Sequence, residues 1–205
     1  CVKLSNSKAW RPRPLVACIE ELAKIGAQMS SLREVMIWDD NFSLDISRAK
    51  DFLRLYAAKG FKYRLRSANM RADKIDRELL LLLKGAGGDE VQFGVEHGDE
   101  EVFRRVGKGE TLADIERGAE LVNSCKMKLG CSFIIGLPYD TLKKTLTSIS
   151  LAKKLNPDHV HWNILVPYKG TAVYEYFKKN GWVDDARIPF TLQQDGLSFE
   201  PNAAT

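Results

Sequence analysis

The sequence lacks any hydrophobic run long enough to cross a membrane. Its longest apolar stretches, such as the five leucines at residues 79–83, are far shorter than the roughly 20 residues that a transmembrane helix needs. The first ten residues, CVKLSNSKAW, include no apolar segment of the kind that a signal peptide carries. We therefore expect no membrane partner.

Cysteine is also scarce. The chain of 205 residues has four cysteines and no CxxC pair, which does not predict a disulfide framework. Cys18 and Cys131 lie within the apolar patterns VACIEEL and GCSFIIGL, where a free thiol packs like a small hydrophobic group. Cysteine usage of this kind predicts a protein of the reducing cytoplasm.

Neither sign of charge dominates. The 31 basic and 27 acidic residues give a net charge of +4 and are well mixed along the chain, which indicates a solvated surface and no nucleic-acid partner. The sequence has no GxGxxG or P-loop motif, and its one glycine-rich stretch, KGAGGDE, precedes a predicted strand where a phosphate loop would follow one.

What the chain does contain is a regular alternation of two hydrophobic patterns. Apolar segments rich in β-branched residues predict buried strands, and these segments are residues 34–40, 61–68, 89–96, 131–137 and 159–167. Apolar stripes at helical spacing lie between them, and they begin at Leu15, Ile46, Ile75, Leu112, Leu142 and Val173. Side chains that favour helix N-caps precede several stripes, namely Asp45, Asp73, Asp99, Thr111 and Asp140.

Strands that alternate with helices predict a parallel sheet with right-handed crossovers, and so an α/β protein. Because a helical segment precedes the first predicted strand, we expect a further strand upstream of residue 1. A complete eight-unit barrel takes about 250 residues, so we predict a partial (β/α)6 TIM-like barrel without its first strand. Residues 1–183 would form this core and residues 184–205 a C-terminal extension.

In either a barrel or a doubly wound sheet, chemistry takes place at the carboxyl ends of the strands. Those ends read WDDN, SANMR, GVEHG, GLPYD and VPYKGT. They are rich in polar residues, glycine and proline, and they are where we place the candidate site.

Five motifs at these strand ends carry a resemblance to a known family. IWDDNF, MRADKIDRELL, FGVEHGDEEVFRRVGKGET, SFIIGLPYDT and PYKGT occur in this order. The chain resembles the radical S-adenosylmethionine superfamily from Cys1 to about residue 180, and within it the cobalamin-associated, oxidative-cyclase-like branch of iron–sulfur oxidoreductases. GLPYD and PYKGT differ from the family's usual GLPGE and PYPGT.

The resemblance implies a set of cofactors and a reaction. The family holds a [4Fe–4S] cluster on three cysteines of a CxxxCxxC loop, and Cys1 matches the last of them. The chain would then be a fragment that begins at this cysteine and is inactive alone. Members reductively cleave S-adenosylmethionine to a 5′-deoxyadenosyl radical, which removes hydrogen from a substrate, here an unknown small molecule. Flavodoxin or ferredoxin would supply the electron, and a missing upstream domain would supply cobalamin.

The resemblance also implies roles for residues of the candidate site. Asp39 and Asp40 would bind the methionine moiety of the cofactor, although the family's glycines are absent there. Glu96 would bind the ribose or the amino group, Lys108 the carboxylate, and Gly136 would lie on the adenine side. Arg71 would orient the cofactor or the substrate. The full set of expected ligands is Cys1 for the metal and Asp39, Asp40, Arg71, Glu96, Lys108 and Gly136 for the cofactor.

Plainer interpretations of these residues stay open at this point. Arg71 could form a salt bridge with Asp73 or Asp76, and Lys108 could belong to a surface turn. His97 has no evident partner and is interpreted as structural. For the whole chain, the alternatives are a nucleotide- or phosphate-binding (β/α) enzyme without a cluster, or a non-catalytic α/β interaction module.

Overall fold

A computed structural model describes residues 10–183 of the chain. These residues fall into two units, one spanning Trp10–Ile164 and the other described over residues 165–183. Cys1 and the predicted extension at 184–205 lie outside the described residues, and the expected domain boundary at residue 183 stays a prediction. No helix within the described part of the chain is both long and apolar enough to span a bilayer.

The first unit is an α/β structure with parallel strands. A four-stranded sheet has the order β3-β4-β5-β6, and two further strands pair as β1-β2, all of them parallel. The strands are β1 Glu34–Val35, β2 Arg64–Leu65, β3 Ser67–Met70, β4 Glu90–Glu96, β5 Lys128–Ile135 and β6 His159–Ile164. Because neighbours in the larger sheet follow one another in sequence, the arrangement confirms the fold class expected of part of a (β/α) barrel.

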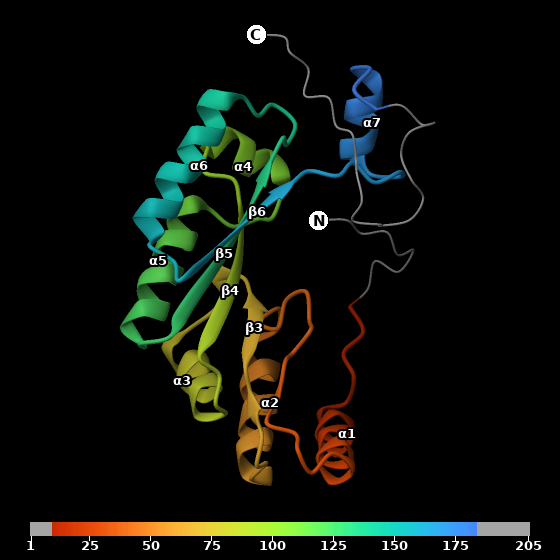
Figure 1. The fold of residues 1–205 in the computed structure, drawn as a ribbon, viewed down its shortest axis with the longest axis vertical. Helices are drawn as coiled ribbons and strands as arrows, with labels where there is room; N and C mark the ends of the chain where they lie inside the picture. The colour runs from red at the N-terminus through yellow and green to blue at the C-terminus, as the bar shows by residue number, and fades with distance from the viewer. Residues whose placement is uncertain (1–9, 184–205) are drawn as a thin grey trace. The chain divides into compact units, whose positions relative to one another are not determined.

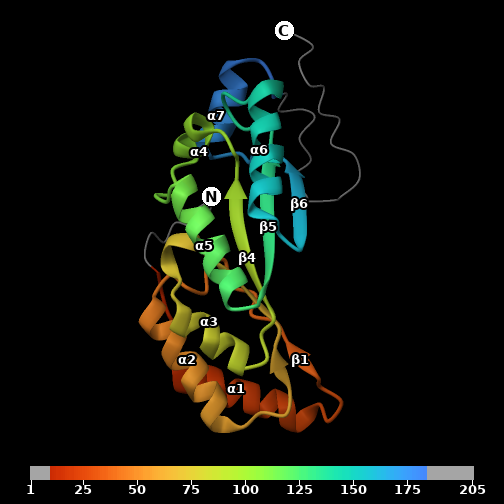
Figure 2. The ribbon, with the colours of Figure 1, turned by 90° about the vertical axis from the view of Figure 1, so that its left-hand side faces the viewer.

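The helices of the first unit lie between successive strands, except the first helix, which precedes β1. They are α1 Leu15–Gln28, α2 Ile46–Lys59, the 3₁₀ turn η1 Ala72–Lys74, α3 Arg77–Gly85, α4 Glu100–Val106, α5 Leu112–Ser124 and α6 Leu142–Leu155. Helices α5 and α6 lie on the same side of β4 and β5 in both views (Figure 1 and Figure 2). The second unit contributes α7, Ala172–Lys179, which begins at its N-cap Thr171.

The two faces of the larger sheet differ in chemistry. On β4, the alternate residues Val91, Phe93 and Val95 are buried in the core shared with the helices. Positions 92 and 94, which are Gln92 and Gly94, lie on the opposite side because successive residues of a strand alternate between the two faces. We call this side, opposite α5 and α6, the inner face. It carries polar residues where the helix-covered face carries apolar ones.

The predicted strands 61–68 and 34–40 differ most from the structure. The segment 61–68 forms β2 and β3 on either side of Arg66, whose N–H donates to Val35 and whose carbonyl accepts from Asp89. Arg66 is therefore the point at which the chain passes from pairing with β1 to pairing with β4. The first strand ends at Val35, well before residue 40, and Trp38 beyond it is 90% exposed.

Two predicted N-caps and one predicted stripe are also wrong. Asp76 caps α3 and Thr141 caps α6, because Asp73 is bound by Arg71 and Asp140 by groups of neighbouring loops. The caps at Asp45, Asp99 and Thr111 are confirmed. The predicted stripe of α6 is mostly exposed, with Leu142 at 79%. The helix instead buries the face whose members are Ser148, Leu151, Ala152 and Leu155.

Candidate functional site

The expected site residues converge on the carboxyl ends of β3, β4 and β5. Parallel strands end at one edge of a sheet, and the loops that follow them therefore lie side by side. Arg71 follows β3, Glu96 ends β4 and Gly136 follows β5. Hydrogen bonds and ion pairs join these three loops.

Glu96 has an unusual backbone. Its φ is +65°, and the N–H of His97 donates to the carbonyl of Val95 at 2.8 Å, so the strand ends in a tight three-residue turn centred on Glu96. A positive φ is costly for a residue with a side chain, and such strain concentrates at functional sites. The turn directs the carboxylate to Lys108, whose Nζ lies 3.2 Å from Oε1.

Lys108 lies in the loop after α4, and its ammonium group is surrounded by oxygen atoms. Besides Glu96, it contacts Oε1 of Glu110 at 3.0 Å and donates to the carbonyl of Gly94. Its side chain is only 10% exposed. The interpretation of Lys108 as a solvated turn residue is therefore wrong, since the side chain is turned inward onto the end of β4.

Glu110 is a site residue that the sequence did not reveal. Its side chain is 1% exposed. The contact with Lys108 is an ion pair without the geometry of a hydrogen bond, and neither carboxylate oxygen accepts a hydrogen bond from the described residues. A buried carboxylate normally accepts several hydrogen bonds, so Glu110 has acceptor capacity that the described residues leave unused. Next to the helix cap Thr111, it reads in the sequence as an ordinary solvated residue.

Gly94 leaves room for these charges. A Cβ atom at this position would lie 2.7 Å from Oε1 of Glu96 and 3.0 Å from Nζ of Lys108. Any larger residue would therefore displace the pair. We call Gly94, Glu96, Lys108 and Glu110 together the charged cradle.

The charged cradle has a net negative charge. One ammonium group faces two carboxylates, those of Glu96 and Glu110, and all three groups are largely removed from water. Burying an unbalanced charge is costly unless a partner is present. A ligand with a surplus positive charge would neutralise the cradle, and a ligand with both an ammonium and a carboxylate group could bind both signs of charge within it.

Arg71 supports the cradle from the side of β3. Its guanidinium group contacts Asp73 through Nε at 2.8 Å and Nη2 at 2.9 Å, and Nη1 donates to the carbonyl of Lys108. The hydrogen bonds to Asp73 raise the pKa of Arg71 above its ordinary value. The salt bridge considered from the sequence is therefore formed with Asp73. Through the Lys108 carbonyl, the same side chain also fixes the loop that carries the ammonium group.

Asp39 and Asp40 lie at the edge of this network. Both are exposed. Asp39 accepts from the N–H of Asn41 at 3.3 Å, and its carbonyl accepts from Asn69 of β3 at 3.1 Å. Asp40 makes no hydrogen bond or ion pair with the part of the chain that the structure describes. The structure thus connects Asp39 to the site through β3, whereas Asp40 is unattached.

Gly136 is held at the end of β5. Its φ is +84°, a conformation that favours glycine. Its N–H donates to Oδ2 of Asp140 at 3.0 Å, and the other oxygen of that carboxylate lies 3.1 Å from Nε2 of His97. His97 directly follows Glu96, so the loops after β4 and β5 are joined. The partner that His97 lacked in the sequence is therefore Asp140.

The described cysteines are structural. Cys125 and Cys131 are buried free thiols, and burial raises the pKa of Cys131 to about 12. Cys18 is half-buried on α1. Among residues 10–183, no group of three His, Cys, Asp or Glu side chains is arranged to hold a metal ion. The predicted ligand Cys1 lies outside the described residues, so its role stays a prediction.

The inner face adds two residues that the sequence did not single out. In the register of the sheet, Gly94 pairs with Ser132 of β5, and Ser132 pairs with His161 of β6. Paired residues share a face, so a hydroxyl and an imidazole continue from the cradle across the sheet. His161 is exposed. Only the pairing register reveals this row, because its members come from three strands that are far apart in the sequence.

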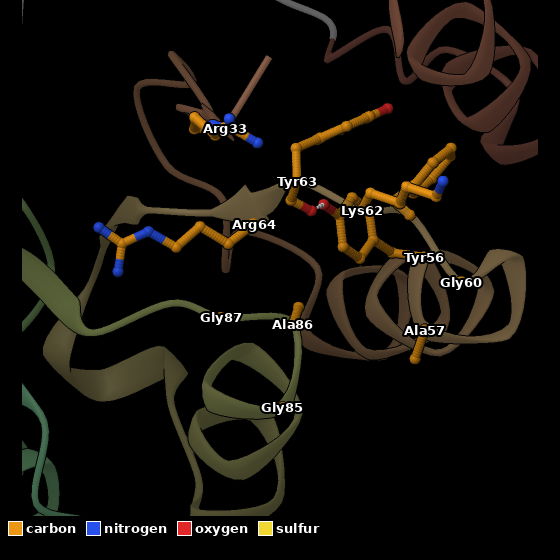
Figure 3. A pocket seen from close by; sticks show the side chains of 11 residues that line it. Arg33, Tyr56, Ala57, Gly60, Lys62, Tyr63, Arg64, Gly85, Ala86 and Gly87 are labelled. Carbon is orange, nitrogen blue, oxygen red and sulfur yellow. Dashed lines mark hydrogen bonds between the residues drawn. The ribbon is translucent and has the colours of Figure 1, made fainter. Parts of the chain in front are cut away.

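A hollow of about 410 Å³ lies at the opposite ends of the strands (Figure 3). Its lining includes Arg33 and Arg64 beside the starts of β1 and β2, together with Gly87 before β4. In it, the Tyr56 hydroxyl donates to the carbonyl of Tyr63. Since chemistry in α/β sheets takes place at the carboxyl ends, we do not take this hollow as the active site.

A partial α/β barrel with a charged cradle at the carboxyl ends of its strands is typical of an enzyme that binds a small polar cofactor. Residues 3–152 match the Radical SAM superfamily, and the chain belongs to this family. The resemblance inferred from the five motifs is confirmed. Membership also argues against the two alternatives, a cluster-free nucleotide-binding enzyme and an interaction module.

Curated relatives cover a longer protein. An uncharacterized methyltransferase of Pyrococcus horikoshii is 30% identical over 184 residues, which are 86% of this chain and 39% of that protein. A probable threonylcarbamoyladenosine tRNA methylthiotransferase of the same organism is 23% identical over 185 residues, 86% of this chain and 43% of that protein. The chain thus spans about two fifths of the length of these relatives.

Solved structures support the fold. The radical S-adenosylmethionine methyltransferase TsrM of Kitasatospora setae, with cobalamin and a [4Fe–4S] cluster bound, superposes with a TM-score of 0.69 at 22% identity, over 83% of this chain and 32% of that one. The cobalamin-dependent S-adenosylmethionine radical enzyme OxsB gives a TM-score of 0.59 at 21% identity, over 84% and 26%. S-adenosylmethionine, one of the expected cofactors, gives the family its name, TsrM holds cobalamin and a [4Fe–4S] cluster, and OxsB holds aqua-cobalamin.

The charged cradle fits S-adenosylmethionine. The cofactor carries a sulfonium, an ammonium and a carboxylate group, and so a net charge of +1 that would offset the surplus carboxylate of the cradle. The unused acceptors of Glu110 suit an ammonium donor. The missing side chain at Gly94 lets the carboxylate of Glu96 and the ammonium group of Lys108 lie close to the backbone of β4.

Proposed function

We propose that this chain is the part of a radical S-adenosylmethionine enzyme that binds S-adenosylmethionine and the cluster. Lys108 would bind the carboxylate of the cofactor and Glu110 its ammonium group, while Glu96 would accept hydrogen bonds from the ribose or share the ammonium. Arg71 would fix the Lys108 loop, and Gly136 would lie on the adenine side. Asp39 and Asp40 would approach the methionine moiety from the loop after β1. The observation that carries the proposal is the buried, negatively charged cradle in a chain of this family.

When bound, a reduced cluster would supply the one electron needed to cleave the bond between sulfur and C5′ of S-adenosylmethionine, and the products would be methionine and a 5′-deoxyadenosyl radical able to abstract hydrogen. The residues of this chain bind and orient the cofactor. Lys108 and Glu110 fix the two ends of the amino acid moiety, and the buried setting strengthens both ion pairs because little water screens them. Cys1 would be one of the thiolate ligands of the cluster.

The reaction that follows is open between two classes. The branch that the motifs resemble consists of oxidoreductases, and hydrogen abstraction suits such a reaction. The other candidate is methyl transfer, which is favoured by the P. horikoshii relative named as a methyltransferase and by the fold shared with TsrM. Because both comparisons point to methyl transfer, we propose that a cobalamin-dependent methyl transfer is tested before an oxidoreductase reaction.

We propose that the substrate is a small molecule bound on the inner face. Ser132 and His161 offer a hydroxyl and an imidazole beside the cradle, and such groups hydrogen-bond a polar substrate. The tRNA-modifying relative makes tRNA the alternative to test against it. Flavodoxin or ferredoxin would supply the electron, and a reducing cytoplasm would suit the oxygen-sensitive cluster.

Iron content and cofactor cleavage test the proposed function. The complete protein, purified and reconstituted without oxygen, should bind about four irons and convert S-adenosylmethionine with a chemical reductant to methionine and 5′-deoxyadenosine. Cys1→Ala should abolish both, whereas Cys125→Ser, at the buried thiol that directly follows α5, should retain the iron. A protein without iron would contradict the proposal. Iron that survives Cys1→Ala would remove Cys1 from the cluster.

A further inference from the structure

His97 is buried and both of its ring nitrogens are engaged. Its residue is 0% exposed. The backbone N–H of Asp99 donates to Nδ1 at 3.0 Å, and Nε2 lies 3.1 Å from Oδ1 of Asp140. Because Nδ1 accepts a hydrogen bond, the proton of the neutral imidazole is on Nε2. His97 therefore donates to Asp140, and the pair has a defined direction.

Asp140 collects hydrogen bonds from three places in the fold. Besides His97, it accepts from the N–H of Gly136 at 3.0 Å, and the hydroxyl of Thr145 on α6 lies 3.0 and 3.1 Å from its two oxygens. Its side chain is 4% exposed. A carboxylate that accepts this many bonds in a buried place is rigid. It connects the end of β4, the end of β5 and the first turns of α6.

The segments that this pair joins are both strained. Glu96 has a φ of +65° and Tyr139, next to Asp140, has a φ of +68°. Such conformations persist only where the surroundings hold them. A second hydrogen bond also fixes the loop after β4, because the N–H of Gly98 donates to the hydroxyl of Ser148 on α6 at 2.8 Å. The loop after β4 is thus fixed at His97 and at Gly98.

We propose that His97 and Asp140 are positioning residues that hold Glu96 and Gly136 in the arrangement that binds S-adenosylmethionine. The proposal rests on the proposed function of the cradle. The pair itself does not contact the cofactor. His97 fixes the residue that follows Glu96, and Asp140 fixes the backbone of Gly136. Without the bond between them, the two loops would move independently and the cofactor would lose a preorganised site.

Two substitutions at one position separate this role from simple packing. In His97→Gln, the amide nitrogen takes about the place of Nε2 and can still donate to Asp140. In His97→Asn, the shorter amide can accept from Asp99 and cannot reach Asp140. Asp140→Asn replaces one of the two acceptor oxygens with an NH2 donor, so this side chain can no longer accept from both His97 and Gly136. Ile115→Val, in the core at α5, lowers stability without touching either loop and serves as the control.

The experiment measures S-adenosylmethionine affinity in the complete, cluster-loaded protein and hydrogen exchange in the peptide that contains Gly136. His97→Asn and Asp140→Asn should weaken binding by about tenfold or more, the loss of a hydrogen bond to a charged group, and should speed exchange of that peptide. His97→Gln should stay within about threefold of wild type and keep the slow exchange. Ile115→Val should change neither.

The outcomes distinguish two failures. Wild-type protein that binds no S-adenosylmethionine overturns the proposed function and this proposal with it. Wild-type binding with equal affinities in His97→Asn and His97→Gln overturns this proposal alone. An affinity loss in Ile115→Val as large as that in His97→Asn would also overturn it, because the effect would then follow stability and not the bond to Asp140.

Discussion

In the unit Trp10–Ile164, the charged side chains at the carboxyl ends of the strands are buried, whereas the ion pair at the amino ends is exposed. At the carboxyl ends, Lys108 and Glu110 are nearly removed from water and face a surplus carboxylate. At the amino ends, Arg64 pairs with Glu34 at 3.0 Å and remains 49% exposed. A surface pair of this kind contributes little to stability, whereas buried charges without full compensation are costly.

The difference shows that the carboxyl ends of the strands contain buried charges that lower stability, which indicates that these charges serve a function. Hydrophobic side chains in the cradle would be cheaper than three buried charges. The hollow at the amino ends is lined by aromatic side chains and exposed cations, and the Tyr56 hydroxyl there donates to a backbone carbonyl, that of Tyr63 (Figure 3). We infer that the carboxyl end is arranged for a charged ligand and the amino end for the stability of the fold.

The largest effect is expected from removing the lysine of the cradle. Lys108→Met should lower the free energy of unfolding by about 3–5 kcal/mol, because it leaves two carboxylates without their buried partner. Adding Glu110→Gln should recover part of the loss, because it neutralises one of the two carboxylates and leaves Glu96 without its partner. Urea unfolding of the single and double variants provides the measurement. A single variant as stable as wild type would show that the cradle charges are solvated.

The second prediction tests the space in the cradle. Gly94→Ala should fold, since a Cβ there meets the mobile ends of Glu96 and Lys108, but it should weaken S-adenosylmethionine binding by about 1.5–3 kcal/mol because the ion pair shifts. Gly85→Ala, where a Cβ meets no atom within 4 Å, is the matched control and should bind normally. Titration calorimetry with the cluster-loaded protein compares them. Equal binding by both variants would show that the cradle does not hold the cofactor.

The third prediction concerns pH at the amino end. Burial, with a smaller contribution from Tyr63, raises the pKa of Tyr56 from 10 to about 12. The folded state keeps this phenol protonated, so its contribution is complete below pH 10 and is lost as pH rises from 10 to about 12. Tyr56→Phe should cost about 1 kcal/mol at neutral pH and flatten the alkaline fall. Unfolding measured from pH 8 to 11.5 checks this, and an equally steep fall in the variant would assign it to other groups.

The smallest effect is expected at the exposed pair. Arg64→Gln should change the free energy of unfolding by no more than about 1 kcal/mol and leave S-adenosylmethionine binding unchanged. The same urea and calorimetric measurements apply. A loss comparable to that of Lys108→Met would erase the contrast between the two ends.

The alternation of strands and helices was predictable because each element carries its own period of apolar residues. The face of α6 that is buried was not predictable from that period. The helix has apolar residues on two sides. The side with Leu151 and Leu155 packs against the rest of the protein, whereas Leu142 on the other side is exposed. Strand ends such as Arg66 depend on which neighbour the backbone pairs with, which no local pattern records.

Part of the candidate site was also within reach of the sequence. The motifs place Glu96 and Lys108 at successive loop positions, and the structure brings them together. Glu110 and the bond between His97 and Asp140 were missed for one physical reason. Burial and pairing across 43 residues arise from tertiary packing, so a glutamate beside a helix cap and an aspartate before α6 read as ordinary surface residues.

One measurement tests the central claim, that the charged cradle binds the amino acid moiety of S-adenosylmethionine. It is the affinity of the cluster-loaded Lys108→Met/Glu110→Gln double variant for S-adenosylmethionine, determined by calorimetry beside wild type, with urea unfolding to confirm that the variant is folded. We predict a folded variant that is more stable than Lys108→Met alone and an affinity at least about tenfold weaker than that of wild type, since both charged contacts are removed. A folded double variant that binds S-adenosylmethionine as tightly as wild type would contradict the account.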